Sequence, residues 1–263
     1  MRGLYNAAGS MLVNQVRLEN ISNNLSNLNT PGYKRTEVVA RTFPEILLYR
    51  TEKFAPGLPV ENRSRFLTHG YPRGPIGIAA ENIAVEETVL VHIPGAPRVT
   101  DRHLDLALGQ PGFFVVQTQQ GLAYTRDGHL QLSADGTLVN ASGFPVLGER
   151  GPIVLDMEQP VIDQAGNIYQ ENQFVDKLRI VNFAENAPLR KDGYNLFRVD
   201  EGTASQAVDA IVFQGYLEES NADLSKQMTD MIRVRRSYEA AQKVSQVYDR
   251  MLSRAANDLG SLG

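Results

Sequence analysis

Apolar residues recur with a heptad spacing along the last long stretch of the chain, from Leu217 to Leu259. The stretch lacks Gly and Pro and is rich in Ala, Met, Gln, Lys and Arg, which favour helices. This pattern predicts one helix, capped by Ser220 with Asp223 three residues on and ended by Gly260. At about 1.5 Å per residue it would be roughly 60 Å long, longer than a domain of this size needs. The helix should therefore find packing partners outside its own domain.

The N-terminal stretch shows a similar pattern. Apolar residues recur in heptads from Leu4 to Leu28, which predicts a first helix over residues 1–28. Many Asn residues lie along it, and Asn disfavours helix interiors, so the helix should be ordered only when it is packed. The alternative is a frayed surface helix. The predicted helix-exit turn is the run Asn29, Thr30, Pro31 and Gly32.

The two predicted helices should pair, antiparallel or side by side, as a coiled-coil-like stalk. The residues expected to form the assembly interface are Leu18, Ile21, Leu25, Leu28, Leu224, Met231, Val234, Tyr238, Tyr248 and Leu252. Further apolar residues widen the C-terminal stripe, namely Met228, Ile232, Val244, Val247 and Met251. A stripe this wide predicts contact with more than one helix, and hence with other subunits.

Between the first helix and the next regular pattern, residues 33–80 contain many Pro and Gly residues and predict an extended connector. Within it, the run Thr42-Phe43-Pro44-Glu45 has the form of a helix cap with a first-turn Pro. We therefore expect one short helix to begin there.

Residues 81–216 alternate short apolar runs with turn dipeptides, which predicts β-strands. The clearest strands are expected at 113–118, 122–126, 129–133 and 137–140. The dipeptides Gln120-Gly121, Asp127-Gly128 and Asp135-Gly136 between them favour tight hairpins. The predicted fold class is α+β, with an all-β central domain built as a sandwich or open barrel. The predicted segments are 1–32 (axial helix), 33–80 (connector), 81–216 (β-rich core) and 217–263 (axial helix).

Composition narrows the function classes. The net charge of −4 and the lack of a dense Lys/Arg tract argue against nucleic acid as a partner. The absence of Cys excludes disulfides and thiolate chemistry. No apolar run is long enough to insert into a membrane, and the N-terminus lacks the apolar core of an ordinary cleaved signal peptide.

Motifs for catalysis or cofactor binding are not evident in the sequence. The four His residues are scattered, and no metalloprotease, phosphate-loop, nucleophile-elbow or EF-hand motif occurs. Asp101, His103 and Asp105 could bind a metal from one strand face, although a polar strand face explains them more simply. The acidic pairs Glu86-Glu87 and Glu218-Glu219 are expected to be solvated. The cluster Arg233, Arg235 and Arg236 is expected to be a charged outer helix face rather than a site for an anionic partner. We therefore predict no enzyme activity, no cofactor and no metal.

Three stretches of the chain resemble the sequence signatures of a known protein family and occur in the same order. They are 23–34 (NNLSNLNTPGYK), the central runs 105–108 (DLAL), 112–117 (GFFVVQ) and 124–128 (YTRDG), and 215–221 (GYLEESN) with 231–232 (MI) and 236–239 (RSYE). Together they resemble the signatures of the axial proteins of the bacterial flagellar rod and hook. The chain departs from the family pattern at Gln110, Arg235 and Ala241, where Gly, Gln and Asn are usual. The non-Gly residue at 110, the single β-domain and the run 148–153 make the chain more similar to the proximal rod member than to the distal rod or hook proteins.

The resemblance implies an inner tube of terminal helices with the β-domain facing outward, located in the flagellar basal body. It further implies export through the flagellar type III apparatus without signal cleavage, and no covalent chemistry. The expected partners are copies of this chain, neighbouring rod and hook proteins, and the export apparatus, and the expected role is a subunit of the torque-transmitting shaft. The alternatives are a secreted β-rich enzyme or glycan-binding protein dimerised by its helices, and an assembly regulator or scaffold absent from the mature rod.

Overall fold

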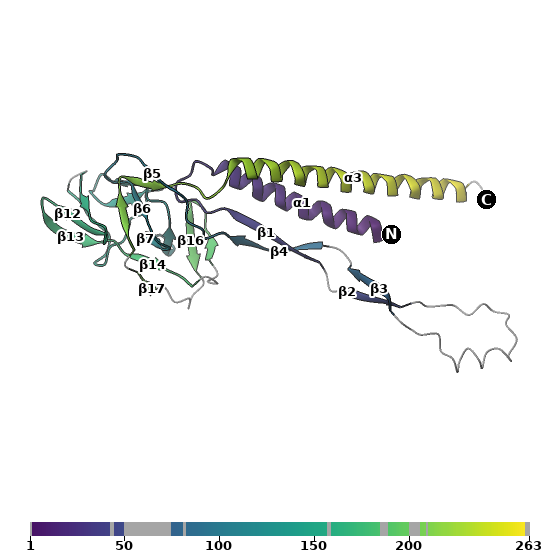
Figure 1. The fold of residues 1–263 in the computed structure, drawn as a ribbon, viewed down its shortest axis with the longest axis horizontal. Helices are drawn as coiled ribbons and strands as arrows, with labels where there is room; N and C mark the ends of the chain where they lie inside the picture. The colour runs from purple at the N-terminus through teal and green to yellow at the C-terminus, as the bar shows by residue number, and fades with distance from the viewer. Residues whose placement is uncertain are drawn as a thin grey trace, which may run out of the picture. The chain divides into compact units, whose positions relative to one another are not determined.

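The computed structural model describes residues 2–42, 45–49, 75–80, 83–156, 159–184, 189–199, 206–208 and 210–260. Its fold class is α+β, as predicted, with a helix at each end and a β-rich region between them (Figure 1). The chain divides into two compact units. One contains Asn20–Glu37 and Val89–Met231, and the other contains Met1–Glu19, Val38–Thr88 and Ile232–Gly263.

The two terminal helices, α1 (Arg2–Ser26) and α3 (Leu224–Gly260), run antiparallel (Figure 1). The Asn14 side chain donates a hydrogen bond to the Ser237 hydroxyl over 3.1 Å. Nearer the N-terminus, a Cβ placed on Gly3 would lie 2.3 Å from the Tyr248 hydroxyl oxygen. As the position on α1 rises from 3 to 14, its partner on α3 therefore falls from 248 to 237.

The C-terminal helix begins later than the sequence predicts. Leu217 lies in strand β19 (Tyr216–Glu218), which pairs with β5 (Pro97–Val99), so the predicted helix start at Ser220 is wrong. The helix is capped instead by the Asp223 carboxylate, which accepts a hydrogen bond of 2.9 Å from the Lys226 amide. For Leu217, the first position of the heptad pattern, pairing of its strand with β5 is more favourable than an additional helical turn.

Part of the predicted connector is paired β-structure. Strand β1 (Thr36–Thr42) pairs with β4 (Ile83–Leu90), and β2 (Glu45–Tyr49) pairs with β3 (Pro75–Ala80). The predicted short helix is therefore wrong over residues 45–49, because this apolar and aromatic run finds a strand partner. Thr42 ends a strand and caps no helix, while Phe43 and Pro44 lie outside the described residues.

A six-stranded sheet organises the central region, in the order β15-β16-β8-β7-β14-β17. Its strands are β15 (Leu189–Lys191), β16 (Leu196–Val199), β8 (Gly121–Thr125), β7 (Phe113–Thr118), β14 (Ile180–Asn182) and β17 (Gln206–Ala207). Antiparallel pairing joins its neighbours throughout. The remaining strands are β6 (Leu106–Leu108) with β18 (Val212–Gln214), β9 (Leu130–Leu132) with β10 (Leu138–Asn140), and β11 (Val161–Ile162), β12 (Asn167–Gln170) and β13 (Gln173–Lys177) together.

The core lies on both faces of this sheet. Phe114 and Val116 of β7 belong to one buried apolar cluster, and the alternating Phe113 and Val115 belong to a second. Burial on both faces explains why this strand reads as one continuous apolar run instead of an apolar–polar alternation.

Two of the three predicted hairpin turns are present. Gly121 and Gly136 have φ of 112° and 75° and lie in the turns joining β7 to β8 and β9 to β10. The hairpin predicted at Asp127-Gly128 is wrong, since β8 pairs with β7 and β16 and not with β9. Gly128 serves a close approach instead, because a Cβ there would lie 1.6 Å from the Leu106 carbonyl oxygen.

Candidate functional site

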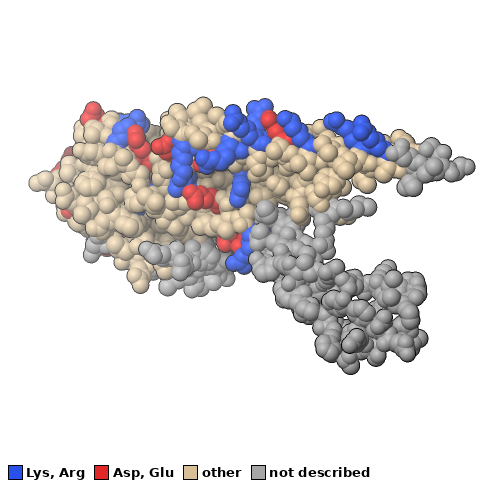
Figure 2. All heavy atoms as spheres, turned by 45° about the vertical axis from the view of Figure 1, so that its right-hand side comes forward, with Lys and Arg blue, Asp and Glu red and all other residues tan. Residues whose placement is uncertain are grey.

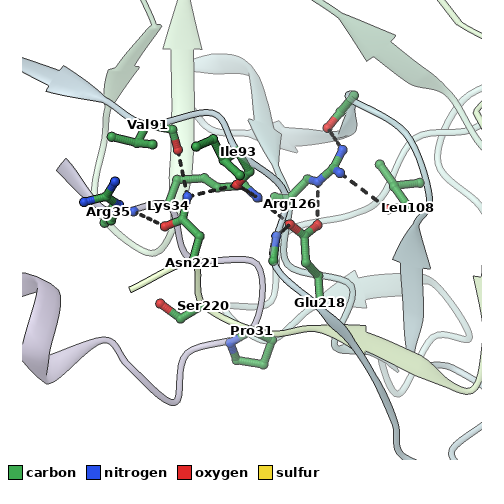
Figure 3. A network of polar contacts seen from close by, with 12 residues as sticks. Pro31, Lys34, Arg35, Val91, Ile93, Leu108, Arg126, Glu218, Ser220 and Asn221 are labelled. Atoms are coloured by element: carbon green, nitrogen blue, oxygen red, sulfur yellow. Dashed lines mark hydrogen bonds and ion pairs between the residues drawn. The ribbon is translucent and has the colours of Figure 1, made fainter. Parts of the chain in front are cut away.

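A buried polar network joins segments far apart in the sequence (Figure 3). We call Gly32, Lys34, Arg126, Glu218 and Asn221 the junction. Gly32 and Lys34 follow α1, Arg126 follows β8, Glu218 ends β19, and Asn221 precedes α3. The junction thus brings together all three of the stretches that carry the family resemblance.

The carboxylate of Glu218 is the centre of the junction. Glu218 is only 3% exposed to solvent. One oxygen accepts hydrogen bonds from the Lys34 ammonium and, over 2.8 Å, from the Gly95 amide. The other oxygen accepts a 2.6 Å hydrogen bond from Arg126 Nε (Figure 3). These three donors, on different segments of the chain, fix the orientation of the buried carboxylate.

The two cations also donate to backbone carbonyls. Arg126 donates through Nη1 to the carbonyls of Gln110 and Gly112, and Lys34 donates to the Ile93 carbonyl over 3.1 Å. Burial lowers the pKa of Lys34, while the charge and hydrogen bond of Glu218 act in the opposite direction. Two buried cations therefore share one carboxylate, and backbone dipoles satisfy most of their remaining donors.

Asn221 fastens the segment before α3 to the segment after α1. Its side-chain oxygen accepts a 2.7 Å hydrogen bond from the Arg35 amide. Its side-chain nitrogen donates to the carbonyls of Val91 and Ile93, each over 2.9 Å (Figure 3). One amide side chain thereby satisfies backbone groups on two other segments.

Gly32 allows a close approach of two backbone segments in this network. Its φ is 64°, and a Cβ placed on it would lie 2.3 Å from the Arg126 carbonyl oxygen. Its amide donates a 2.7 Å hydrogen bond to the Glu218 carbonyl. The position needs Gly both for its left-handed backbone and for lack of space.

The end of α1 is anchored by polar groups as well. Asn24 is buried, and its side chain donates to the Thr36 carbonyl over 2.9 Å and accepts from the Thr36 amide over 3.0 Å. The Tyr33 hydroxyl lies 2.8 Å from Asn23 Oδ1 and 3.0 Å from Asn24 Oδ1. Burial raises the pKa of Tyr33 to about 12. These Asn residues disfavour a helix by their local preference, but in the folded chain their hydrogen bonds hold the end of α1 in place.

The predicted helix-exit turn lies where the sequence places it. Helix α1 ends at Ser26, and turn structure follows through Gly32. Asn29 is exposed, Thr30 and Pro31 are half-buried, and the Pro31 carbonyl accepts a 2.9 Å hydrogen bond from the Asn195 side chain.

The predicted interface residues have unequal burial in the single chain. Ile21 is buried, and the half-buried members are Leu18, Leu25, Leu28, Met231, Val234 and Tyr238. The exposed members are Leu224, Tyr248 and Leu252. Their roles in an interface between subunits stay predictions.

The junction is not among the sites predicted from the sequence. Glu218 and Glu219 are predicted to be solvated, which is wrong for the buried Glu218 but agrees with the exposed Glu219. A signal was present, because Lys34, Arg126 and Glu218 each lie in one of the three stretches that carry the family resemblance, yet no spacing rule joins residues 184 positions apart.

The possible metal set does not assemble. Asp101 and His103 are exposed residues outside any strand, and Asp105 is buried with its carboxylate 3.0 Å from His129 Nδ1. Among the residues that the structure describes, no group of three or more His, Cys, Asp or Glu side chains is arranged to hold a metal ion. The hydrogen bonds of Lys34 and Arg126 described above are made to other residues of the chain itself.

Three protein-family profiles match the chain. "Flagella basal body rod protein" matches residues 4–34, "Flagellar hook protein FlgE/F/G D1 domain" matches 108–170, and "Flagellar basal body rod FlgEFG protein C-terminal" matches 214–259. Residues of the junction lie in each of the three matched ranges.

Individual proteins resemble the chain over nearly its whole length. The flagellar basal-body rod protein FlgG of Agrobacterium fabrum is 33% identical, over 98% of this chain and 100% of that protein. FlgG of Bacillus subtilis is 30% identical over 98% of both chains. The hook-basal body complex protein FlhO of Bacillus subtilis is 29% identical over the full length of both. In the described part of the chain, no helix combines the length and hydropathy needed to cross a membrane.

Proposed function

The chain belongs to the family of flagellar basal-body rod proteins and is a structural subunit of the rod, and we propose that it assembles through its two terminal helices. Its partners in this proposal are copies of itself and neighbouring rod and hook proteins. Repetition of one helix-to-helix contact around a screw axis gives a filament, which can transmit torque from motor to hook.

The observation that carries this proposal is the surface of α3. In the single chain this long helix exposes large apolar side chains along most of its length, with Ile232 56% and Met251 61% exposed. Met228, Val244 and Val247 are exposed as well. Soluble monomers seldom leave such a series of apolar residues uncovered, so other helices are expected to cover it.

Basic residues accompany these apolar ones on α3. Arg236, Lys243 and Arg250 recur every seven residues and are exposed, and Figure 2 shows Lys and Arg side chains spaced along this helix. Arg233 and Arg235, predicted with Arg236 to lie on a charged outer helix face, are exposed as well. A helix with one face on α1, apolar flanks and a charged outer face suits a layer with neighbours on its sides.

The finer architecture belongs to the same proposal. We propose that α1 and α3 pack as a coiled-coil-like stalk, with the antiparallel contacts of Asn14 and Gly3 in support. The β-rich region would be a sandwich or open barrel facing outward, supported by the two apolar clusters on the central sheet. The segments 1–32, 33–80, 81–216 and 217–263 remain the proposed functional divisions.

Export and position complete the proposal. The subunit would leave the cell through the flagellar type III apparatus without signal cleavage and would carry out no covalent chemistry. A proximal place in the rod stays a prediction, because the names of the relatives do not specify a position along it.

The proposal is tested by removing apolar surface from α3. A triple variant, Ile232→Gln, Val247→Gln and Met251→Gln, keeps good helix formers at exposed positions. We expect the purified chain to fold normally, while cells producing only this variant lose swimming and yield basal bodies with incomplete rods by electron microscopy.

The control is Val161→Gln, which removes an apolar residue, 64% exposed, from strand β11. Swimming and complete rods are expected for it. Complete rods and normal swimming with the triple variant would contradict assembly through α3.

A further inference from the structure

A pocket of about 450 Å³ opens beside the junction. It lies within the range of volumes that hold small ligands. Its lining includes Lys34 and Arg126, together with the apolar residues Phe113, Phe183 and Leu189. The pocket therefore has a cationic part and an apolar part.

The cationic part is the junction itself. Ile93 and Gly112, whose carbonyls accept hydrogen bonds from Lys34 and Arg126, also line the pocket. Both cationic residues and two of the residues that accept hydrogen bonds from them therefore line the same pocket. Since the two cations share the single carboxylate of Glu218, the junction carries one positive charge in excess.

Lys34 also has a donor to spare. An ammonium group has three N–H donors, and within the described part of the chain its hydrogen bonds go to the Ile93 carbonyl and Glu218. Burying a positive charge without a full set of partners is unfavourable, and an anion supplied from the pocket would reduce that cost.

The apolar part selects the kind of anion. Phe113 and Phe183 are buried side chains whose ring centroids lie 5.9 Å apart, and both belong to the second apolar cluster. A strongly hydrated ion such as phosphate would gain nothing from these walls. A carboxylate on an apolar body would bury that body against them while its charge meets the excess positive charge.

We propose that this pocket binds a carboxylate carried on a small apolar group. Such a ligand could be a free organic acid or an acidic side chain, with its methylene groups, from a second copy of the chain. The proposal does not depend on assembly of the rod, because the pocket is formed by residues of a single chain.

The test is a titration of the full-length, isotope-labelled chain at low concentration, followed by NMR. Hexanoate is expected to shift the amide signals of Gly112 and Phe113 saturably. Hexanol, which lacks the charge, and acetate, which lacks the apolar body, should each bind at least about tenfold more weakly. Equal binding of hexanoate and hexanol, or no saturable shift with hexanoate, would overturn the proposal.

Lys34→Met removes the free donor, but it also disturbs the junction. A second variant, Leu189→Glu, is therefore used; it places a carboxylate of the chain itself at the pocket lining. Hexanoate binding should be lost in Leu189→Glu and kept in the control Val161→Glu, on strand β11. Unchanged hexanoate binding in Leu189→Glu would contradict the assignment of the pocket.

The source of the carboxylate is separated by protein concentration. If it comes from a second copy, the Gly112 and Phe113 signals should move as the chain is concentrated without added acid, and hexanoate should reverse that movement. If it is a free acid, these signals should be independent of protein concentration while hexanoate still binds.

Discussion

The junction and the outer surface of α3 reverse the usual distribution of residues. In the junction, three ionised side chains are buried, with Glu218 3% exposed, whereas α3 leaves Ile232 and Met251 more than half exposed. The junction's groups find their partners within one chain. The apolar residues of α3 do not find theirs within the described part of the chain.

This contrast indicates which parts of the molecule are complete alone. Buried ion pairs add little net stability, but removing one partner is costly, so such a network fixes one geometry of the chain segments that it joins. An exposed apolar helix face fixes nothing in the single chain and is available to a neighbour.

Glu218→Gln should destabilise the chain most. It leaves two buried cations without their carboxylate, and the free energy of unfolding should fall by about 3–5 kcal/mol in urea titrations. The matched control is Glu219→Gln, since Glu219 is exposed and its 3.6 Å ion pair with Arg98 is on the surface. A control effect as large as that of Glu218→Gln would remove the distinction between the two acids.

Gly32→Ala should have the next largest effect. The added Cβ meets the Arg126 backbone, which cannot move away as a flexible side chain could. Gly143→Ala is the control, because its φ is 83° and nothing lies within 4 Å of an added Cβ. We expect a loss of about 1 kcal/mol for the control, from backbone strain alone, and a clearly larger loss for Gly32→Ala. Equal losses would mean that the close approach is unimportant.

Tyr33→Phe should change how stability depends on alkaline pH. The folded pKa of Tyr33, about 12, lies above the ordinary value of 10.0, so the folded state retains the proton longer than the unfolded state. Its contribution is complete below pH 10 and is lost as the pH rises from 10 through 12. Stability of the Phe variant, measured by denaturant titration, should decline less steeply over this window; a parallel decline would contradict this account.

The triple Gln variant of α3 should change the stability of the isolated chain least. Its three side chains are exposed, so the free energy of unfolding should stay within about 0.5 kcal/mol of the parent. Thermal unfolding in dilute solution measures this directly. A loss of several kcal/mol would show that these residues stabilise the single chain and are not reserved for neighbours.

The elements that the sequence predicts well are those set by local pattern. The long C-terminal helix, the N-terminal helix and the strands around Gly121 and Gly136 follow from heptad spacing and from turn dipeptides. The short helix predicted to begin at Thr42-Phe43-Pro44-Glu45 is wrong over residues 45–49, because its cap signature is weak beside the strand pairing that residues 75–80 provide. Local preference decides only where no distant partner competes for the backbone.

The junction could not be predicted in the same way. Glu218 and Glu219 are identical in type and adjacent in sequence, yet β19 directs the first into the network and leaves the second exposed. Glu218 is the last residue of β19, which pairs with β5, whereas Glu219 follows the strand. The difference between the two acids becomes informative only when the strand and its partner are known. Gly128 was mistaken for a hairpin residue for a related reason, because its need for Gly arises from distant Leu106.

The ion pair between Lys34 and Glu218 also has a consequence for timing. The two residues are separated by 184 positions, so a polypeptide that emerges with its first residue leading presents the lysine long before the matching carboxylate exists nearby. This ion pair at the exit from α1 can therefore form only after the strand carrying that carboxylate has arrived.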